Sequence, residues 1–237
     1  MPDTYHSQST APHNALQETA ISATFTPRFD LAASILDCGK EPDVSDYDAA
    51  AAYATWPLID YTTIEETQDQ LQINAWLQAQ DLTGKRVLHV GAGNSSLARL
   101  VGAQAAYICS VTVSPNEKAF ADALLLPNYQ TLLANKHGAV FSASQQGQQY
   151  DFIVDNNIAS FVCCQRHLQR YLETLVHVLA ADGVLITHWL GMQWTLDLGI
   201  NDVERVWRLD EQKLRTIATA YSLQVTREGD LFFLRHA

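Results

Sequence analysis

The chain has 237 residues, of which 47% are hydrophobic, and it carries 15 Lys and Arg against 26 Asp and Glu, a net charge of −11. This length fits one large domain, or a domain with an added segment, and provides enough apolar residues for a substantial core. The acidic balance and the lack of a basic cluster argue against a nucleic-acid substrate, because phosphate binding needs clustered cations. A small molecule, free or bound to a carrier, is the expected partner.

Targeting signals and cysteine chemistry are not evident in the sequence. No apolar run approaches the length of a membrane span, and the first thirty residues lack the basic start and apolar core of a signal peptide. Cys38, Cys109, Cys163 and Cys164 show neither a disulfide framework nor metal-ligand spacing. We therefore expect a cytoplasmic protein without a metal site, while a redox pair at the adjacent Cys163 and Cys164 stays open. The oligomeric state is not readable from the sequence.

Residues 1–62 are expected to form an N-terminal arm and lid. Residues 1 to about 24 are polar and of mixed composition, which is typical of a mobile arm. Phe25 to Tyr61 combines an acidic stretch, an alanine run and several aromatic residues, which predicts helical pieces that either pack on the main domain or cover a ligand. Thr63-Ile64-Glu65-Glu66 has the pattern of a capping box. It predicts a helix start and places the main domain at 63–237.

Short apolar runs rich in β-branched residues predict five buried parallel strands with helices between them. The expected strands are Val87–Val90, Ala106–Val113, Tyr129–Ala134, Asp151–Val154 and Val184–His188. The expected helices include one that starts at Ser114-Pro115-Asn116-Glu117, one over His167–Leu179 and one over Leu209–Tyr221. The chain ends in Leu223–Thr226 and Leu231–Leu234, whose short connection demands an antiparallel pair. This order predicts a doubly wound, mostly parallel α/β sheet with a C-terminal antiparallel hairpin and a helical N-terminal lid.

A glycine turn follows the first predicted strand. Gly91-Ala92-Gly93 comes directly after it, and Asn94-Ser95-Ser96 leads into a helix. This arrangement brings backbone N–H groups and a helix start up to a nucleotide, although a tight turn without a ligand has the same pattern. Ligands of such sheets bind at the carboxyl ends of the strands. Since Thr112-Val113, Asn135 and Asp155-Asn156-Asn157 also follow strands, one pocket can use them all.

The motif order and the closing hairpin resemble the class I S-adenosylmethionine (SAM) dependent methyltransferases over roughly Thr63 to Ala237. HVGAGNSS is similar to the first motif of that family, VTVSPNE to its second-strand motif, YDFIVDNN to its fourth motif and LAADGVLITH to its usual turn and fifth strand. The resemblance implies SAM as co-substrate or sole substrate. It also implies contacts with the methionine and ribose from Gly91, Ala92 and Gly93, with the ribose and adenine from Thr112 and Val113, and with the adenine from Asn135 and Lys136.

Two positions depart from the pattern of this family. The family usually carries an acid two residues before the first glycine, where this chain has His89, and an acid at the end of the second strand, where this chain has Thr112. Threonine can accept one hydrogen bond from the ribose, but a weaker one than a charged acceptor forms. The absence of an acid at position 112, together with Ser96 at the place of a third glycine, also argues against a nicotinamide dinucleotide as the cofactor.

The expected reaction is nucleophilic displacement at the SAM sulfonium, most simply methyl transfer to a small molecule. The enzyme must hold a nucleophile within about 3–3.5 Å of the reacting carbon and exclude water. By the resemblance, Asp155, Asn156 and Asn157 lie beside the sulfonium, where the amides offer oxygens and Asp155 could orient or deprotonate an acceptor. The same residues are also common where a strand ends in a turn.

Two other functions are consistent with the absence of the two family acids, at His89 and Thr112. A neutral imidazole at His89 would not hold the methionine ammonium protonated, so the free amine could close a four-membered ring and release methylthioadenosine. That chemistry is similar to the azetidine-2-carboxylate synthases and makes His89 a candidate catalytic residue, although a buried histidine commonly bonds a backbone carbonyl instead. A SAM-binding protein without catalysis is the other alternative.

Overall fold

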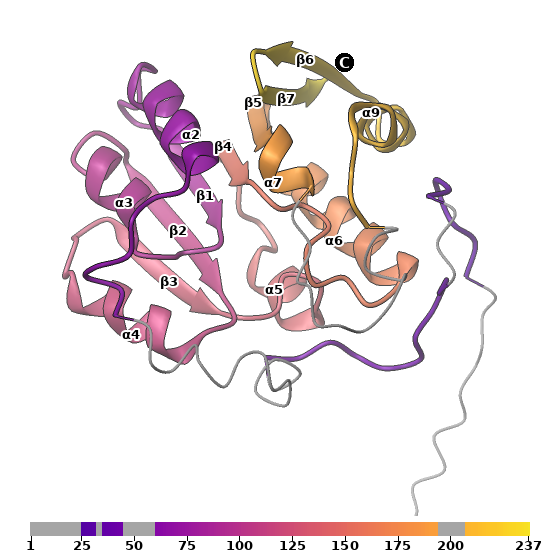
Figure 1. The fold of residues 1–237 in the computed structure, drawn as a ribbon, viewed down its shortest axis with the longest axis horizontal. Coiled ribbons are helices and arrows are strands. Elements are labelled where there is room, and N and C mark those ends of the chain that lie inside the picture. The colour runs from indigo at the N-terminus through magenta and orange to yellow at the C-terminus, as the bar shows by residue number, and fades with distance from the viewer. Residues whose placement is uncertain (1–24, 32–34, 45–59, 194–206) are drawn as a thin grey trace, which may run out of the picture.

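One seven-stranded sheet organises the chain in the computed structural model, which describes residues 25–31, 35–44, 60–193 and 207–237. The strand order is β3-β2-β1-β4-β5-β7-β6 (Figure 1). Neighbouring strands from β3 to β5 are parallel, and β7 pairs antiparallel with both β5 and β6. The strands are β1 (Arg86–Val90), β2 (Tyr107–Thr112), β3 (Tyr129–Leu133), β4 (Tyr150–Asp155), β5 (Leu179–His188), β6 (Leu223–Glu228) and β7 (Leu231–His236).

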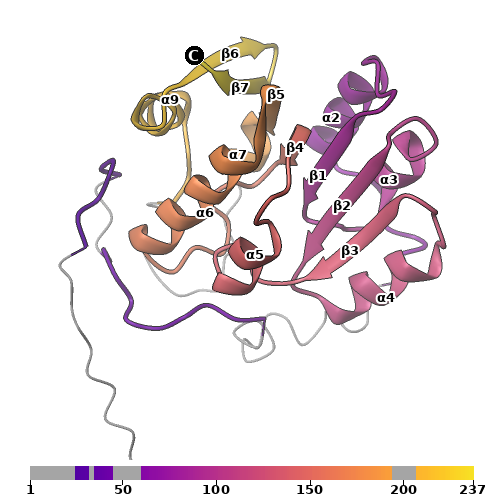
Figure 2. The same ribbon diagram turned by 180° about the vertical axis from the view of Figure 1, so that it is seen from behind.

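Helices cover both faces of this sheet (Figures 1 and 2). They are α2 (Gln68–Gln78), α3 (Ser96–Val101), α4 (Pro115–Ala123), α5 (Ala139–Ser144), α6 (Gln165–Val178), α7 (Trp189–Gln193) and α9 (Glu211–Ala220). One core layer joins α2 and α3 to the sheet through side chains such as Leu77 and Leu97. The other joins α5, α6 and α9 through Phe141, Leu172 and Ile217. Because both faces are covered, the central strands read as continuous apolar runs rather than as alternating ones.

The predicted order of strands and the closing hairpin are confirmed. The side chain of Ser114 accepts a hydrogen bond from the Glu117 N–H at 3.2 Å, and Pro115 is the first residue of α4, as the sequence predicts. The turn between β6 and β7 contains Gly229 at φ +60°, a conformation that favours glycine. Local sequence signals therefore determine how α4 begins and how the sheet closes.

Two element boundaries differ from the prediction. The helix expected from Thr63 begins instead at Gln68, while the Thr63 hydroxyl donates to the Asp60 carbonyl at 3.0 Å. Thr67 and Gln70 repeat the capping-box spacing of Thr63 and Glu66. The helix begins directly after Thr67, at the second of these two patterns. β5 begins at Leu179, before the predicted Val184, because its pairing with β4 shifts register and takes up extra residues.

The described part of the N-terminal segment packs on the domain. Phe29 and Leu31 are buried in the core, and residues 35–44 run past α5 and the start of α6 (Figure 1). The backbone N–H of Gln165 donates to the Ile35 carbonyl at 3.1 Å. Residues 25–31 and 35–44 are extended or turn-like, and the other helical pieces expected before Tyr61 lie outside the described residues. The lid stays a prediction.

Candidate functional site

A cavity opens at the carboxyl ends of β1 to β4, where the strand order reverses direction between β1 and β4. This is the position at which open α/β sheets bind ligands. The cavity is lined by the last residues of these strands, by residues that follow them and by one residue of α4: Val90, Gly91, Val111, Thr112, Val113, Glu117, Ala134, Lys136, Asp155, Asn157, Ser160 and Phe161.

The glycine turn leaves open space in front of the backbone. Gly91 has φ +99° and Gly93 has φ +51°, both in the region that favours glycine. A Cβ atom added at either position would meet no other atom within 4 Å. The Gly91 N–H donates to the Val111 carbonyl at 2.9 Å, which ties the turn to β2. The turn therefore offers its surface to a ligand and is fixed on the sheet side.

Glu117 supplies a carboxylate at the end of β2, where Thr112 replaces the acid of the family pattern. The Thr112 hydroxyl donates to the Glu117 carboxylate and accepts the Ser114 N–H at 3.0 Å. Burial raises the pKa of Glu117, while the Thr112 hydroxyl and the Gly93 backbone N–H partly oppose the rise. Both residues line the cavity, but the Thr112 hydroxyl is already bonded to Glu117 and Ser114, so the Glu117 carboxylate is the stronger acceptor in this part of the wall.

Lys136, Asp155 and Tyr171 form a buried polar network in the opposite wall. Lys136 Nζ lies 3.1 Å from one Asp155 oxygen and 3.3 Å from the other, and it donates to the Asn157 carbonyl at 2.6 Å. The carboxylate of Asp155 accepts two further hydrogen bonds. The Tyr171 hydroxyl on α6 donates to it at 2.5 Å, and the Asn157 N–H donates to the same carboxylate at 2.9 Å. Burial lowers the pKa of Lys136, while Asp155 opposes the fall. The network holds an Asp155 carboxylate at the cavity surface in one orientation.

The structure brings six of the predicted site residues into the cavity wall: Gly91, Thr112, Val113, Lys136, Asp155 and Asn157. Ala92 and Gly93 belong to the same turn but do not line the cavity. Asn135 is buried; its side chain accepts the His137 N–H at 2.9 Å and donates to the Asp43 carbonyl at 3.4 Å, so it anchors the N-terminal segment.

His89 lies within the sheet rather than on the cavity wall. It is 4% exposed, and its Nδ1 lies 3.5 Å from the Ser110 hydroxyl on β2. Burial lowers the pKa of His89 to about 4, while the nearby Asp155 opposes the fall. The imidazole is therefore neutral at pH 7, as the cyclisation hypothesis requires, but it does not belong to the surface that a ligand would touch.

Asn156 faces α2 and α7 instead of the cavity. Its side-chain amide donates to Asp69 of α2, and its backbone carbonyl accepts the Thr187 hydroxyl at 3.2 Å. Gly191 of α7 lies directly against it: a Cβ added there would lie 2.1 Å from Asn156 Oδ1 and 2.2 Å from its backbone oxygen. The place of Asn156 is set by this close packing.

The variant Gly191→Ala tests that packing. We expect it to lower the free energy of unfolding by about 1–3 kcal/mol, because overpacking forces the backbone to move. Urea unfolding followed by far-UV circular dichroism measures the loss. The control is Ala103→Ser, an exposed position, where we expect a change within about 0.5 kcal/mol. A Gly191→Ala variant as stable as this control would contradict the close packing of α7 against Asn156.

Six wall residues were not singled out as site residues in the sequence: Val90, Val111, Glu117, Ala134, Ser160 and Phe161. Glu117 reads there as the acid of a helix start. Phe161 has φ +63°, which is uncommon for an aromatic residue. Strain of this kind concentrates at ligand sites, but the sequence shows no turn signal for it.

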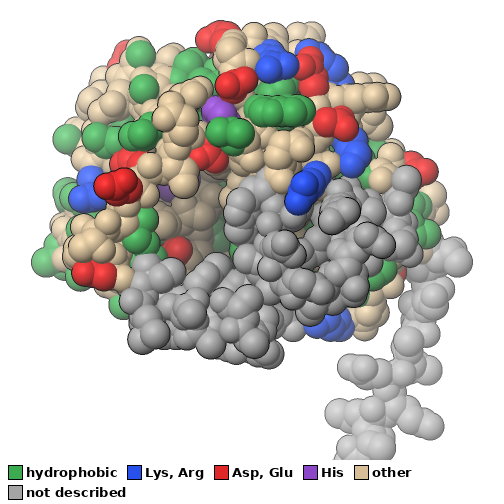
Figure 3. Space-filling model, in the orientation of Figure 1, with side chains coloured by type: hydrophobic (Ala, Val, Ile, Leu, Met, Phe, Trp, Pro, Cys, Tyr) green, Lys and Arg blue, Asp and Glu red, His purple; other side chains and the backbone are tan. Residues whose placement is uncertain are grey.

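On the face in Figure 3, Lys and Arg alternate with Asp and Glu without forming a broad basic patch. Among the described residues, no helix combines the length and apolar character needed to cross a bilayer.

The strand order, the terminal hairpin and the site at the switch point define a class I methyltransferase-like fold. Solved structures with this fold include magnesium protoporphyrin IX methyltransferase (ChlM) from Synechocystis PCC 6803 with bound SAM, at TM-score 0.53 and 16% identity over 82% of this chain and 95% of that chain. DesVI from Streptomyces venezuelae gives TM-score 0.52 and 14% identity over 84% and 100% of the two chains. The N-methyltransferase NodS from Bradyrhizobium japonicum WM9 gives 0.52 and 11% over 73% and 99%.

No protein-family model and no curated protein matches the chain. At identities of 11–16%, the structural likeness establishes the fold. These three neighbours are not named as SAM-cyclising enzymes, so they give no support to the azetidine-2-carboxylate synthase subtype.

Proposed function

We propose that this protein is a SAM-dependent transferase that moves a methyl group from the SAM sulfonium to a small molecule. The observation that carries the proposal is the Glu117 carboxylate, which faces the cavity beside the glycine turn at the end of β2. Two vicinal ribose hydroxyls are the donors that such a carboxylate accepts, and the charge makes these bonds strong. Glu117 of the next helix, α4, would thus take the place of the acid that the family usually carries at the end of its second strand.

The other wall residues fit the rest of the cofactor. The open space before Gly91 admits the ribose and methionine portion at the backbone, and Val113 with Ala134 offers apolar surface to the adenine. SAM, when bound, supplies an activated methyl group and needs no electrophilic assistance from the protein. The chain's part is to align the acceptor and exclude water.

Asp155 is the proposed acceptor-orienting residue. Lys136, Tyr171 and the Asn157 N–H fix its carboxylate, so an acceptor hydroxyl or amine could donate to it without the carboxylate turning away. The same carboxylate also balances the charge of Lys136 at the place where the cationic cofactor would bind. Asn157 lines the cavity next to it, whereas Asn156 contributes by holding the loop against α2 and α7.

Incubation of the purified protein with SAM alone separates the possible reactions. We expect SAM to stay intact, and we expect S-adenosylhomocysteine to form only when a small-molecule extract is added, because methyl transfer needs an acceptor. Liquid chromatography with mass detection identifies the adenosyl product. Methylthioadenosine without an acceptor would contradict methyl transfer and favour cyclisation. SAM that neither reacts nor stabilises the protein against heating at millimolar concentration would contradict a SAM site altogether.

A further inference from the structure

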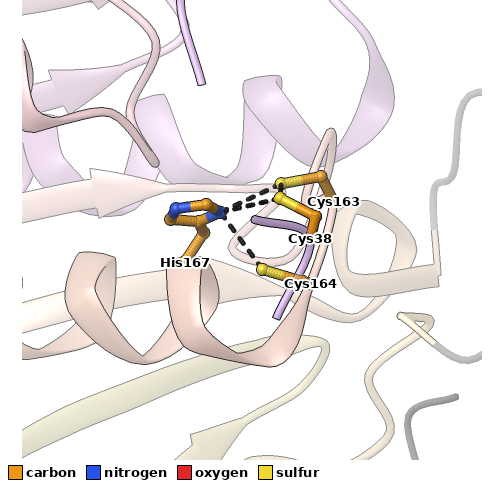
Figure 4. Close-up of side chains that lie close together, drawn as sticks. All are labelled: Cys38, Cys163, Cys164 and His167. Atoms are coloured by element: carbon orange, nitrogen blue, oxygen red, sulfur yellow. Dashed lines mark hydrogen bonds between the residues drawn. The ribbon is translucent and has the colours of Figure 1, made fainter. Parts of the chain in front are cut away.

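Three cysteines and one histidine converge away from the cavity (Figure 4). Cys163, Cys164 and His167 lie at the start of α6, and Cys38 comes from the N-terminal segment. Cys38, Cys163 and Cys164 present Sγ atoms and His167 presents Nδ1, and all four atoms lie within 4.8 Å of one another. The cysteines show no metal-ligand spacing in the sequence, which therefore predicts no metal site, and Cys38 and Cys163 are 125 residues apart. Folding brings the two together.

Hydrogen bonding alone does not account for this cluster. His167 Nδ1 lies 3.1 Å from the sulfur atoms of both Cys163 and Cys164 and 3.5 Å from that of Cys38. One ring nitrogen offers either one N–H or one lone pair. It can satisfy one thiol in a linear hydrogen bond, and the dashed lines in Figure 4 show three sulfur atoms around it. A cation at the centre would satisfy all four ligand atoms at once.

The donor set and its geometry match a tetrahedral zinc site. Structural zinc sites use four cysteine and histidine ligands, with Zn–S near 2.3 Å and Zn–N near 2.0–2.1 Å, which separates the ligand atoms by about 3.5–3.8 Å. The Sγ atoms of Cys38 and Cys163 lie 3.3 Å apart, and the S–N distances are 3.1–3.5 Å. These four atom pairs would move apart by a few tenths of an ångström around the ion, and the two remaining sulfur pairs, which lie within 4.8 Å, would adjust to the same spacing. We propose that Cys38, Cys163, Cys164 and His167 bind one Zn²⁺ ion that fastens the N-terminal segment to α6.

The surroundings hold the ligands in place independently of the metal. The N–H groups of Gln165 and Arg166 donate to the carbonyls of Ile35 and Leu36, and Arg166 forms an ion pair with Asp37 at 2.8 Å. Cys38 is therefore positioned by its neighbours. Cys164 and His167 are buried, whereas Cys38 and Cys163 are partly exposed, which gives an ion a path from solvent.

The site would also brace one wall of the cavity. Ser160 and Phe161 line the cavity, and Cys163 and Cys164 follow them within a few residues. A metal that holds the start of α6 against residues 35–44 therefore restrains the same loop. Binding three thiolates releases protons, so the affinity for zinc should fall in acid.

Metal analysis of the untagged protein, purified with reductant and without chelator, tests the site. We expect about one zinc per chain and, after exchange with Co²⁺, the near-ultraviolet thiolate-to-cobalt absorption and strong visible bands of tetrahedral coordination. Cys38→Ala should weaken zinc binding at least about 100-fold, since even loss of an outer-shell partner costs 10–100-fold. The matched control is Cys109→Ala, a buried cysteine of β2 outside the cluster, which should keep the metal.

Alkylation of the wild-type chain gives a second readout that does not depend on a variant folding. Zinc should protect the partly exposed Cys38 and Cys163 from iodoacetamide, and a chelator should expose both together, as peptide mass spectrometry can follow. The site is overturned if the reduced protein neither contains nor takes up zinc or cobalt. It is also overturned if Cys38→Ala keeps full zinc affinity, or if Cys38 and Cys163 form a disulfide and the reduced chain takes up no metal.

Discussion

Replacement of Asp155 by asparagine is expected to abolish transferase activity and to lower the free energy of unfolding by about 3–5 kcal/mol. Asp155 is 1% exposed and Lys136 is 8% exposed, so the pair is shielded from water. Removal of one partner leaves a buried ammonium without its counter-charge, and its pKa, already lowered by burial, falls further. The amide also no longer balances the Lys136 charge at the place where the cationic cofactor would bind.

Urea unfolding at pH 7 measures the loss, and Asp151→Asn on the same strand is the control. Asp151 pairs with Lys85 at 3.0 Å, but the two side chains are 29% and 44% exposed. Solvent screens such pairs, and we expect a loss of about 1 kcal/mol or less. Equal losses for the two variants would show that the Lys136–Asp155 pair is not shielded as described.

The double variant Lys136→Met with Asp155→Asn separates stability from activity. Removal of both charges takes away the uncompensated ammonium, so we expect stability to recover toward that of the wild type. Activity should not recover, because the proposed acceptor-orienting carboxylate is absent. Transferase activity in a stable double variant would contradict the role of Asp155 and leave a structural one.

Signals that lie within a few residues of one another were read correctly from the sequence. The Ser114-Pro115 helix start, the glycine turn at Gly91 and the closing hairpin each depend on local backbone preferences. The apolar strands are also visible because both faces of the parallel sheet are covered. These features determine the fold class and predict a site at the edge of the sheet where the structure has its cavity.

Features that depend on distant contacts were not read. In the sequence, Glu117 has the pattern of an ordinary acid at a helix start. Its role in the site depends on the packing of α4, which lets the Thr112 hydroxyl donate to the Glu117 carboxylate. Tyr171 has the spacing of a core residue on α6, and its hydroxyl bond to Asp155 is visible only in three dimensions. Cys38 carries no metal-ligand spacing of its own. In each case the partner is specified by tertiary packing, which periodicity does not encode.

Replacement of Glu117 by glutamine is expected to weaken SAM binding by about 10–100-fold, since hydrogen bonds to a charged group contribute about 1.5–3 kcal/mol. The glutamine keeps the size of the side chain but has one acceptor oxygen instead of two and no charge, so its bonds to the two ribose hydroxyls are fewer or weaker. Isothermal titration calorimetry with SAM measures the change. Glu228→Gln, at an exposed position on β6, is the control and should bind as the wild type does.

The pH dependence of binding follows from the same carboxylate. Burial raises the pKa of Glu117, so the group takes up a proton at a higher pH than an exposed glutamate does. The affinity for SAM should therefore fall as the pH drops through this raised pKa, and Glu117→Gln should lose that part of the pH dependence. An unchanged pH profile in the variant would assign the dependence to another group.

Stability and affinity should move in opposite directions in the Glu117→Gln variant. Because the pKa is raised on folding, the folded state binds more protons than the unfolded state between the usual glutamate pKa and the raised value. Stability therefore falls as the pH rises through that window, and this loss persists at neutral pH. Glutamine has no charge to bury, so the free protein should unfold at an equal or higher urea concentration at pH 7. A residue kept only for structure would show the reverse, with stability lost and SAM affinity unchanged.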